Sequence, residues 1–304
     1  MKNIVGSICA LATPFRGGAV DFDAFAKLID FQIEGGTQGL VVAGSTGEAH
    51  ALDQAEYDQL LRRAVARAGG RATILAGTGT ANTRKTIELT RRAQGLGADA
   101  ALVVAPYYVR PTQEGLLRHF VEVADHGGLP VVLYNVPGRT GCDLQPETTA
   151  KLATHDSIVG IKEAIGDAER VRALAQLKGP GFVFLSGDDP TAMSAMLAGA
   201  GGVVSVANNV APGPLRALCD AARTGDRAGA QALHEALLPL FDFLGTEPNP
   251  IPVKWALARL GLGTGELRLP LTAFSCAYHA QAARVLDDVV RLAASIQPPH
   301  SSAA

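Results

Sequence analysis

Residues 131–134 read Val-Val-Leu-Tyr and residues 158–162 read Ile-Val-Gly-Ile-Lys, and short apolar runs of this kind decide the fold. They recur at intervals of about 30 residues, which is the length of one strand-and-helix unit. Six further runs lie at 8–11, 40–43, 73–76, 101–104, 182–185 and 203–206. The sequence therefore predicts eight buried strands.

Segments with helical periodicity separate these runs, and the clearest lie at 21–34, 53–68, 83–96 and 112–124. Asp53 and Thr112 are residue types that favour helix N-termini, and Glu56 completes an Asp-x-x-Glu capping pattern. Near-continuous apolar strands are typical of a parallel sheet covered by helices, and eight units favour a closed barrel. We predict an α/β fold, a (β/α)8 TIM barrel over residues 1–224.

The alternation stops after residue 222, where three segments in a row read as helices, at 226–244, 251–260 and 272–294. We predict a C-terminal appendage of about three helices over residues 225–296. Residues 297–304 are rich in Pro, Ser and Ala, which predicts a disordered tail.

The composition points to a small-molecule ligand. The 304 residues are 47% hydrophobic and 18% charged, with a formal net charge of −2. Basic and acidic residues are mixed, so neither nucleic acid nor an anionic membrane is expected as a partner. No apolar stretch reaches the roughly 20 residues that span a bilayer, and the N-terminus lacks a secretory pattern. Four widely spaced cysteines fit neither a zinc site nor a disulfide scaffold. We expect a cytoplasmic protein without metal or cofactor.

Lys162 is the strongest catalytic candidate, because active sites of such barrels lie at the carboxyl ends of the strands. Period-2 alternation places Ile158, Gly160 and Lys162 on one face, toward the barrel interior, with Gly160 leaving space beside the lysine. Burial disfavours an ammonium, and the free amine is the form that attacks a carbonyl. A strand-end lysine can also extend to water.

Lys254 is the competing lysine. It follows Pro252 near a helix start, where we expect a solvated or capping role.

Tyr134 ends the preceding strand on the same face as Val132, so neighbouring strands would bring it beside Lys162. A phenol there can move protons during imine formation, or simply anchor the strand end by its hydroxyl.

The stretch 44–48, Gly-Ser-Thr-Gly-Glu, could hold a carboxylate or form an ordinary turn. Arg139 follows in a loop where a guanidinium could bind a carboxylate.

Asp188 and Asp189 follow the seventh run without an accompanying His or third carboxylate at ligand spacing. We therefore expect them to cap the next helix rather than to bind a metal.

Several strings, in this order, resemble the dihydrodipicolinate synthase / N-acetylneuraminate lyase family, and the similarity runs from about residue 4 to residue 292. They are Gly-Ser-Thr-Gly-Glu at 44–48, Pro-Tyr-Tyr at 106–108, Tyr-Asn-Val-Pro-Gly-Arg-Thr-Gly at 134–141, Gly-Ile-Lys-Glu-Ala at 160–164, Ser-Gly-Asp-Asp at 186–189 and Glu-Pro-Asn-Pro-Ile-Pro-Val-Lys at 247–254. The resemblance implies that Lys162 forms an imine with pyruvate. It also implies that Tyr134 exchanges protons in a relay with Ser45 and with Tyr108, the latter reaching in from a neighbouring subunit.

The same resemblance implies how the substrates are held. Thr46 and nearby amides would bind the pyruvate carboxylate, and Val204 would pack beside the imine. Arg139 would receive the carboxylate of L-aspartate 4-semialdehyde, the second substrate, in a reaction of lysine and diaminopimelate biosynthesis. A homo-oligomer, a dimer of dimers, is implied as well.

Ser45 departs from the family pattern, in which threonine is common. Serine keeps the hydroxyl but lacks the methyl group that restricts the rotamer. Related lyases that act on sugar acids also use serine, so a lyase for N-acetylneuraminate or 2-keto-3-deoxygluconate is the alternative. A keto-acid sensor without turnover is a second alternative, which the intact lysine, tyrosine and arginine disfavour.

Some members of the family that this chain resembles bind lysine at the dimer interface, and they often present a small residue, an asparagine and a glutamate where this chain has His50, Ala81 and Lys85. Lys85 would repel the ammonium of the ligand, and Ala81 cannot hydrogen-bond its carboxylate. We predict little inhibition by lysine.

Overall fold

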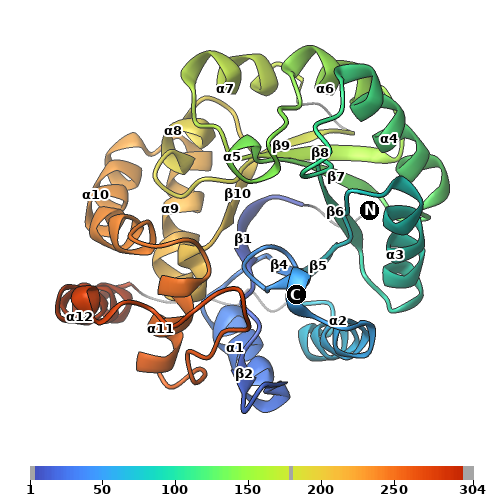
Figure 1. Ribbon diagram of the computed structural model, residues 1–304. Helices are drawn as coiled ribbons and strands as arrows, with labels where there is room; N and C mark the ends of the chain where they lie inside the picture. The colour runs from blue at the N-terminus through green and yellow to red at the C-terminus, as the bar shows by residue number, and fades with distance from the viewer. Residues whose placement is uncertain (1–3, 178–180, 297–304) are drawn as a thin grey trace.

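The computed structural model describes residues 4–177 and 181–296. Eight parallel strands form a closed barrel (Figure 1). In chain order they are β1 (Gly6–Ala10), β4 (Gly39–Val42), β5 (Thr73–Gly77), β6 (Ala100–Val104), β7 (Val131–Asn135), β8 (Ile158–Glu163), β9 (Val183–Ser186) and β10 (Gly202–Ser205). Because β1 pairs with both β4 and β10, the sheet has no free edge. All eight predicted strands and the predicted barrel are confirmed.

Helices surround the barrel (Figure 1). They are α1 (Phe22–Glu34), α2 (Gln54–Ala68), α3 (Thr83–Gly95), α4 (Gln113–His126), α6 (Pro146–Leu152), α7 (Ala168–Ala175), α8 (Ala192–Leu197) and α9 (Pro212–Thr224). Of these, α9 follows the last strand, and the others lie between successive strands of the barrel. Asp53 and Glu56 form the predicted capping box at the start of α2, and Thr112 caps α4. A short hairpin of β2 (Phe15–Arg16) and β3 (Ala19–Val20) lies outside the barrel.

Two buried clusters form the core. One fills the space between strands and helices and includes Phe25, Leu60 and Phe120. The other fills the barrel interior, with members such as Leu75 and Val132. Alternate strand residues supply the two clusters, since successive side chains of a strand point to opposite faces.

A bulge in β8 corrects one prediction. Val131 pairs with Ile158 but Val132 pairs with Gly160, so one residue of β8 is skipped. As a result Ile158 packs in the outer cluster and Val159 in the inner one. The prediction that Ile158 shares a face with Lys162 was wrong, because the bulge interrupts the alternation.

The glycine beside the lysine was also misassigned. A Cβ at Gly160 would lie 2.5 Å from the carbonyl oxygen of Val183, so this glycine permits the close approach of β9 rather than making room for the lysine. A Cβ at Gly187 would lie 2.8 Å from Cε of Lys162. Gly187, just after β9, is the residue whose missing side chain makes room for Lys162.

Three C-terminal helices lie together on one side of the barrel (Figure 1). They are α10 (Arg227–Leu244), α11 (Ile251–Arg259) and α12 (His279–Ser295). The three predicted helices are confirmed, but the last begins at His279 rather than at residue 272, after a short 3-10 turn at Cys276–Tyr278. The predicted tail over 297–304 lies outside the described residues. Across the described ranges, every helix is too short or too polar to cross a membrane.

Candidate active site

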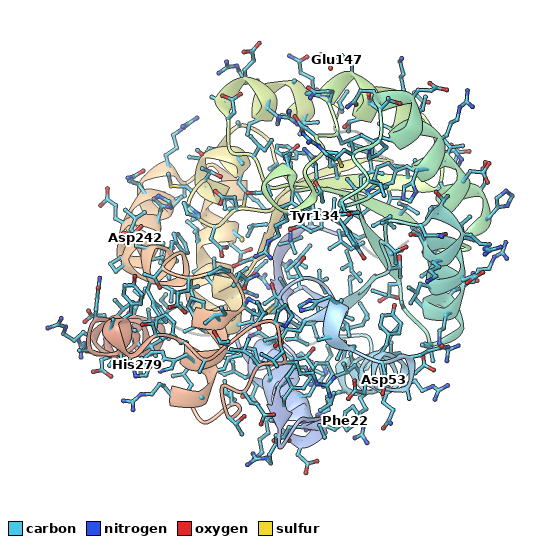
Figure 2. The ribbon with its side chains drawn as sticks, in the orientation of Figure 1. Phe22, Asp53, Tyr134, Glu147, Asp242 and His279 are labelled. Carbon is cyan, nitrogen blue, oxygen red and sulfur yellow. The ribbon has the colours of Figure 1, made fainter. Side chains whose placement is uncertain are left out.

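A cavity of about 1210 Å³ opens at the carboxyl ends of the strands. Five of the seven predicted site residues line it: Ser45, Thr46, Tyr134, Arg139 and Lys162. Figure 2 shows Tyr134 toward the centre of the barrel. The carboxyl ends of the strands and the loops that follow them thus bring together side chains that are far apart in the sequence.

Lys162 and Tyr134 are direct register partners on β8 and β7. Both are buried, at 6% and 7% exposure, and Nζ of Lys162 lies 4.1 Å from the centre of the Tyr134 ring. Among the described residues, no carboxylate forms an ion pair with Lys162. The lysine amine therefore faces an aromatic ring and the cavity, as the alternation of the two strands predicted.

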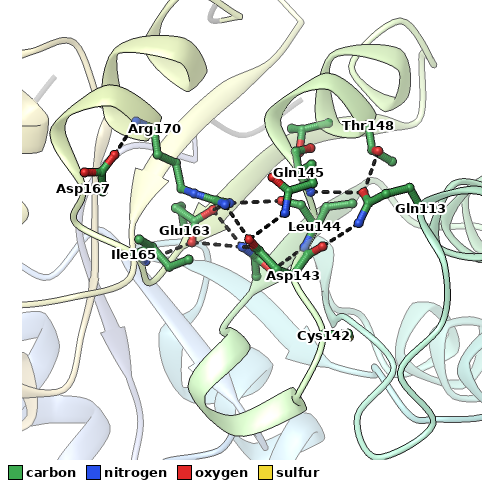
Figure 3. A network of polar contacts seen from close by, with 12 residues as sticks. Gln113, Cys142, Asp143, Leu144, Gln145, Thr148, Glu163, Ile165, Asp167 and Arg170 are labelled. Carbon is green, nitrogen blue, oxygen red and sulfur yellow. Dashed lines mark hydrogen bonds and ion pairs between the residues drawn. The ribbon is translucent and has the colours of Figure 1, made fainter.

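The next residue of each strand points away from the cavity into a polar network (Figure 3). Asn135 Nδ2 donates to both carboxylate oxygens of Glu163, at 3.0 and 3.2 Å, and to Asp143 Oδ1 at 2.8 Å. Arg170 donates from Nη1 to Glu163 at 3.2 Å and from Nη2 to Asp143 at 2.5 Å. Because Asn135 and Glu163 are register partners, this network holds β7 and β8 together one residue beyond Tyr134 and Lys162.

Burial raises the pKa of the Glu163 carboxyl above its ordinary value, while the hydrogen bonds from Asn135 and Arg170 act in the opposite direction. The network was missed in the sequence. Its local signal in the sequence was a polar residue directly after each inward-facing residue, Asn135 after Tyr134 and Glu163 after Lys162.

The loop that follows β4 contains Ser45 and Thr46. Ser45 is half-buried and Thr46 is buried. Thr46 Oγ1 accepts a hydrogen bond of 3.0 Å from Asn249 Nδ2. The loop ends at Glu48, whose φ of 51° is in the left-handed region.

Glu48 is buried and holds Lys254. Its Oε1 lies 2.5 Å from Nζ of Lys254, and its Oε2 accepts from the backbone N–H of Arg268 at 3.1 Å. Lys254 is 3% exposed, so the predicted solvated or capping role was wrong. The position of Lys254 near a helix start does not reveal its partner, because Glu48 lies 206 residues earlier in the chain. Burial lowers the pKa of Lys254, and the Glu48 carboxylate opposes that shift.

Arg139 lies in the short helix α5 (Pro137–Thr140), which follows β7. Its Nη2 donates to the carbonyl oxygen of Asn249 at 3.0 Å, and its side chain lines the cavity. The guanidinium is exposed, and within residues 4–177 and 181–296 its other nitrogens have no hydrogen-bond partner, so they can bind an anion in the cavity.

The two other predicted residues lie outside the cavity lining of a single chain. Tyr108 is 89% exposed, with a φ of 72°, so one chain by itself does not bring it to Tyr134. Val204 packs in the barrel interior, and Val206, two residues later, lines the cavity.

The two aspartates after β9 have different partners. Asp188 accepts from the hydroxyl and the N–H of Thr191, at the start of α8. Asp189 accepts from the N–H groups of Val206 and Ala207, at 3.0 and 2.9 Å. The prediction that both cap the next helix was therefore wrong for Asp189, which instead binds the turn after β10.

The chemistry of the cavity defines a class. It offers a buried primary amine beside a phenol, with hydroxyls and a guanidinium that can bind carboxylates. These groups on a (β/α)8 barrel define a Schiff-base-forming lyase. The family model described as the dihydrodipicolinate synthetase family matches residues 3–289, and the chain belongs to this family.

Relatives and solved structures agree with that assignment. The 4-hydroxy-tetrahydrodipicolinate synthase of Stenotrophomonas maltophilia is 56% identical, covering 96% of this chain and 98% of that protein. The crystal structure of the chloride-inhibited dihydrodipicolinate synthase of Acinetobacter baumannii, complexed with pyruvate, is 44% identical, with a TM-score of 0.93 over 95% of this chain and 99% of that one. A dihydrodipicolinate synthase described as a monomeric variant is 38% identical, with a TM-score of 0.92 over 94% and 97%.

Proposed function

We propose that this chain catalyses the 4-hydroxy-tetrahydrodipicolinate synthase reaction, the condensation of pyruvate with L-aspartate 4-semialdehyde. The observation that carries the proposal is the Lys162 amine, buried beside Tyr134 on a cavity that also presents Thr46 and Arg139. Relatives that share about half of the sequence carry this enzyme name. They favour this activity over the sugar-acid lyase alternative.

The reaction begins at Lys162. Its amine adds to the keto carbon of pyruvate, and loss of water gives a protonated imine. The positive nitrogen acidifies the neighbouring methyl group, which releases a proton and leaves an enamine. The enamine carbon then attacks the aldehyde carbon of the semialdehyde. The amino group of the condensed product attacks the imine carbon, closes the ring and releases Lys162 as the free amine.

Tyr134 is proposed to move protons in these steps, since its phenol is the titratable group next to the amine. Ser45 and Tyr108 would complete the relay. Thr46 would hold the pyruvate carboxylate, Arg139 the carboxylate of the semialdehyde, and Val204 would pack beside the imine.

The proposed role of Tyr108 requires a second copy of the chain. Its side chain projects into solvent between two other exposed apolar residues, Tyr107 and Val109. An exposed apolar group of this kind favours burial against a partner. We propose a homodimer that pairs into a tetramer, and sedimentation at several protein concentrations tests it. We also propose a cytoplasmic location, which fits an enzyme of lysine and diaminopimelate biosynthesis.

A coupled assay tests the proposed reaction. Purified protein is given pyruvate with aspartate semialdehyde, or N-acetylneuraminate, or 2-keto-3-deoxygluconate. We expect turnover with the semialdehyde and little with either sugar acid. Cleavage of a sugar acid without semialdehyde turnover would support the sibling lyase. Imine formation without turnover of any substrate would support a sensor.

A further inference from the structure

The segment between α10 and α11 forms part of the cavity wall. Pro248, Asn249 and Pro250 all line the cavity, although they belong to the C-terminal helical region rather than to a βα loop of the barrel. The barrel strands therefore do not supply every group around the proposed substrates.

Asn249 contacts two proposed substrate-binding residues through different atoms. Its side-chain Nδ2 donates to Thr46 Oγ1 at 3.0 Å, and its backbone carbonyl accepts from Arg139 Nη2 at 3.0 Å. Thr46 follows β4 and Arg139 follows β7, and two strands, β5 and β6, lie between these in the barrel. One residue thus links groups on two separated parts of the cavity wall.

The contact with Thr46 orients a hydroxyl. A threonine hydroxyl has one hydrogen and two acceptor lone pairs. Because the Asn249 amide donates to one lone pair, the hydroxyl hydrogen is free to point toward a carboxylate in the cavity. The β-branched side chain of threonine also restricts the rotation that would lose this direction.

We propose that Asn249 is a positioning residue that presents the Thr46 hydroxyl to the carboxylate of pyruvate and sets its place relative to Arg139. This proposal rests on the proposed function. It makes the C-terminal segment a determinant of selectivity for two substrates that each carry a carboxylate.

A second contact holds the segment against the same loop. Lys254 Nζ pairs with Glu48 at 2.5 Å, two residues beyond Thr46, and Lys254 N–H donates to the carbonyl oxygen of Pro250. Asn249 is therefore fixed by Arg139, which binds its backbone carbonyl, and by Lys254, which ties the following residues to Glu48. Its Oδ1 is buried without a hydrogen-bond partner among the described residues, an unfavourable arrangement for an amide with a purely structural role.

The test separates the two substrates. Asn249→Ala removes the amide but keeps the backbone carbonyl that binds Arg139. The half-saturating pyruvate concentration for borohydride trapping on Lys162 measures pyruvate binding without turnover. We expect it to rise about five- to tenfold, the effect of one lost hydrogen bond. The KM for the semialdehyde should change less than about twofold.

Asn249→Asp should raise the pyruvate constant further, because a carboxylate accepts the Thr46 hydrogen and repels the pyruvate carboxylate. Gln94→Ala is the matched control. It deletes an exposed amide that donates to a backbone carbonyl, that of Gly128, and should leave both constants unchanged. The melting temperature of each variant shows that the protein measured is folded.

A double-mutant cycle of Thr46→Val and Asn249→Ala tests whether the two residues act through one hydrogen bond. If Asn249 acts through the Thr46 hydroxyl, adding Asn249→Ala to Thr46→Val should not raise the pyruvate constant further. Additive effects, or an unchanged constant in folded Asn249→Ala and Asn249→Asp, would overturn the proposal. Should the wild-type protein trap pyruvate but not turn over the semialdehyde, the proposed reaction fails while the trapping arm still decides the role of Asn249.

Discussion

Lys162 and Lys254 are two buried lysines in closely similar surroundings. Their exposures are 6% and 3%, and their Nζ atoms lie 4.1 and 4.0 Å from the ring centres of Tyr134 and Phe15. The two lysines differ in what else lies next to the amine nitrogen. Lys254 is paired with the Glu48 carboxylate, whereas Lys162 faces the cavity. Burial beside an aromatic ring therefore does not by itself make a lysine a nucleophile, because the lysine must also face a space that admits a carbonyl substrate, as Lys162 does and Lys254 does not.

The carboxylate closest to Lys162 in the sequence does not neutralise it. Glu163 lies on the opposite face of β8, since successive strand residues alternate, and Asn135 and Arg170 bind it there. The strand thus separates an amine from the adjacent acid, whereas tertiary packing brings Lys254 to an acid 206 residues away.

Chemical trapping should give the largest difference between the two lysines. Borohydride with pyruvate should label Lys162 and leave Lys254 unmodified, because Lys162 faces the cavity whereas Lys254 is held by Glu48 outside the cavity lining. Lys162→Met should lower kcat/KM by at least about a thousandfold. Mass mapping of the labelled peptide checks the assignment, and a label on Lys254 would reverse the comparison.

Removing the Lys254 charge should affect stability rather than imine chemistry. Lys254→Met leaves Glu48 buried and unpaired, and we expect the free energy of unfolding to fall by about 3 kcal/mol. Adding Glu48→Gln should recover much of this loss. Lys151→Met, at an exposed position, is the control. Urea unfolding measures all four proteins, and equal stabilities of Lys254→Met and wild type would contradict the importance of the pair.

Tyr134→Phe tests the ring and the hydroxyl beside Lys162 separately. The ring remains against the lysine, so we expect a normal fold and trapping still on Lys162. The proton transfer is lost, and kcat should fall about a hundredfold. Steady-state kinetics and a melting curve check both. A near-wild-type rate would exclude Tyr134 from the relay.

A third lysine, Lys85, is exposed and lines the same cavity. With His50 and Ala81 it should make the enzyme poorly sensitive to free lysine, because a cation repels the ligand ammonium. Lys85→Glu should strengthen inhibition by about fivefold, a modest effect for an exposed charge. Titration of lysine into the coupled assay measures it, and strong inhibition of the wild type at submillimolar lysine would contradict the prediction.

The smallest expected effect is a pH dependence of stability from Lys254. Burial lowers its pKa below 10.5, the ordinary value. Between the lowered value and 10.5, the unfolded state holds a proton that the folded state has released, so the free energy of unfolding gains a positive slope with pH. The slope cannot exceed about 1.4 kcal/mol per pH unit. We expect the stability of wild type relative to the Lys254→Met/Glu48→Gln double variant to rise with pH in this range, and a fall would reverse the sign.

The division of the chain into a catalytic barrel over 1–224 and a helical region over 225–296 stays a prediction. We propose it as a division of the architecture only. Asn249 and Lys254, from the second part, contact the loop after β4 in the first. A separately expressed barrel would therefore lack two of the contacts that hold Thr46 and Glu48.

Sequence patterns were sufficient for the eight barrel strands and their order, for the three C-terminal helices and for the inward direction of Lys162 and Tyr134, but not for the β2–β3 hairpin or α5. These follow from periodicities of two and about 3.6 residues, which are local properties of the backbone. The roles of the other candidates came from the family resemblance, which gave no positions in space. These candidates are Ser45, Thr46, Tyr108, Arg139 and Val204. Where a bulge broke the period, at Ile158, the local rule failed.

The pairing of polar groups, in contrast, depends on tertiary packing. Glu48 and Lys254 are 206 positions apart, Thr46 and Asn249 are 203 apart, and Gly187 supplies the space beside Lys162. No local pattern encodes such pairs, because their geometry depends on how the C-terminal helices and the strand ends pack together. A buried lysine was thus predictable from one strand, but whether its charge is neutralised by a carboxylate depends on a distant part of the chain.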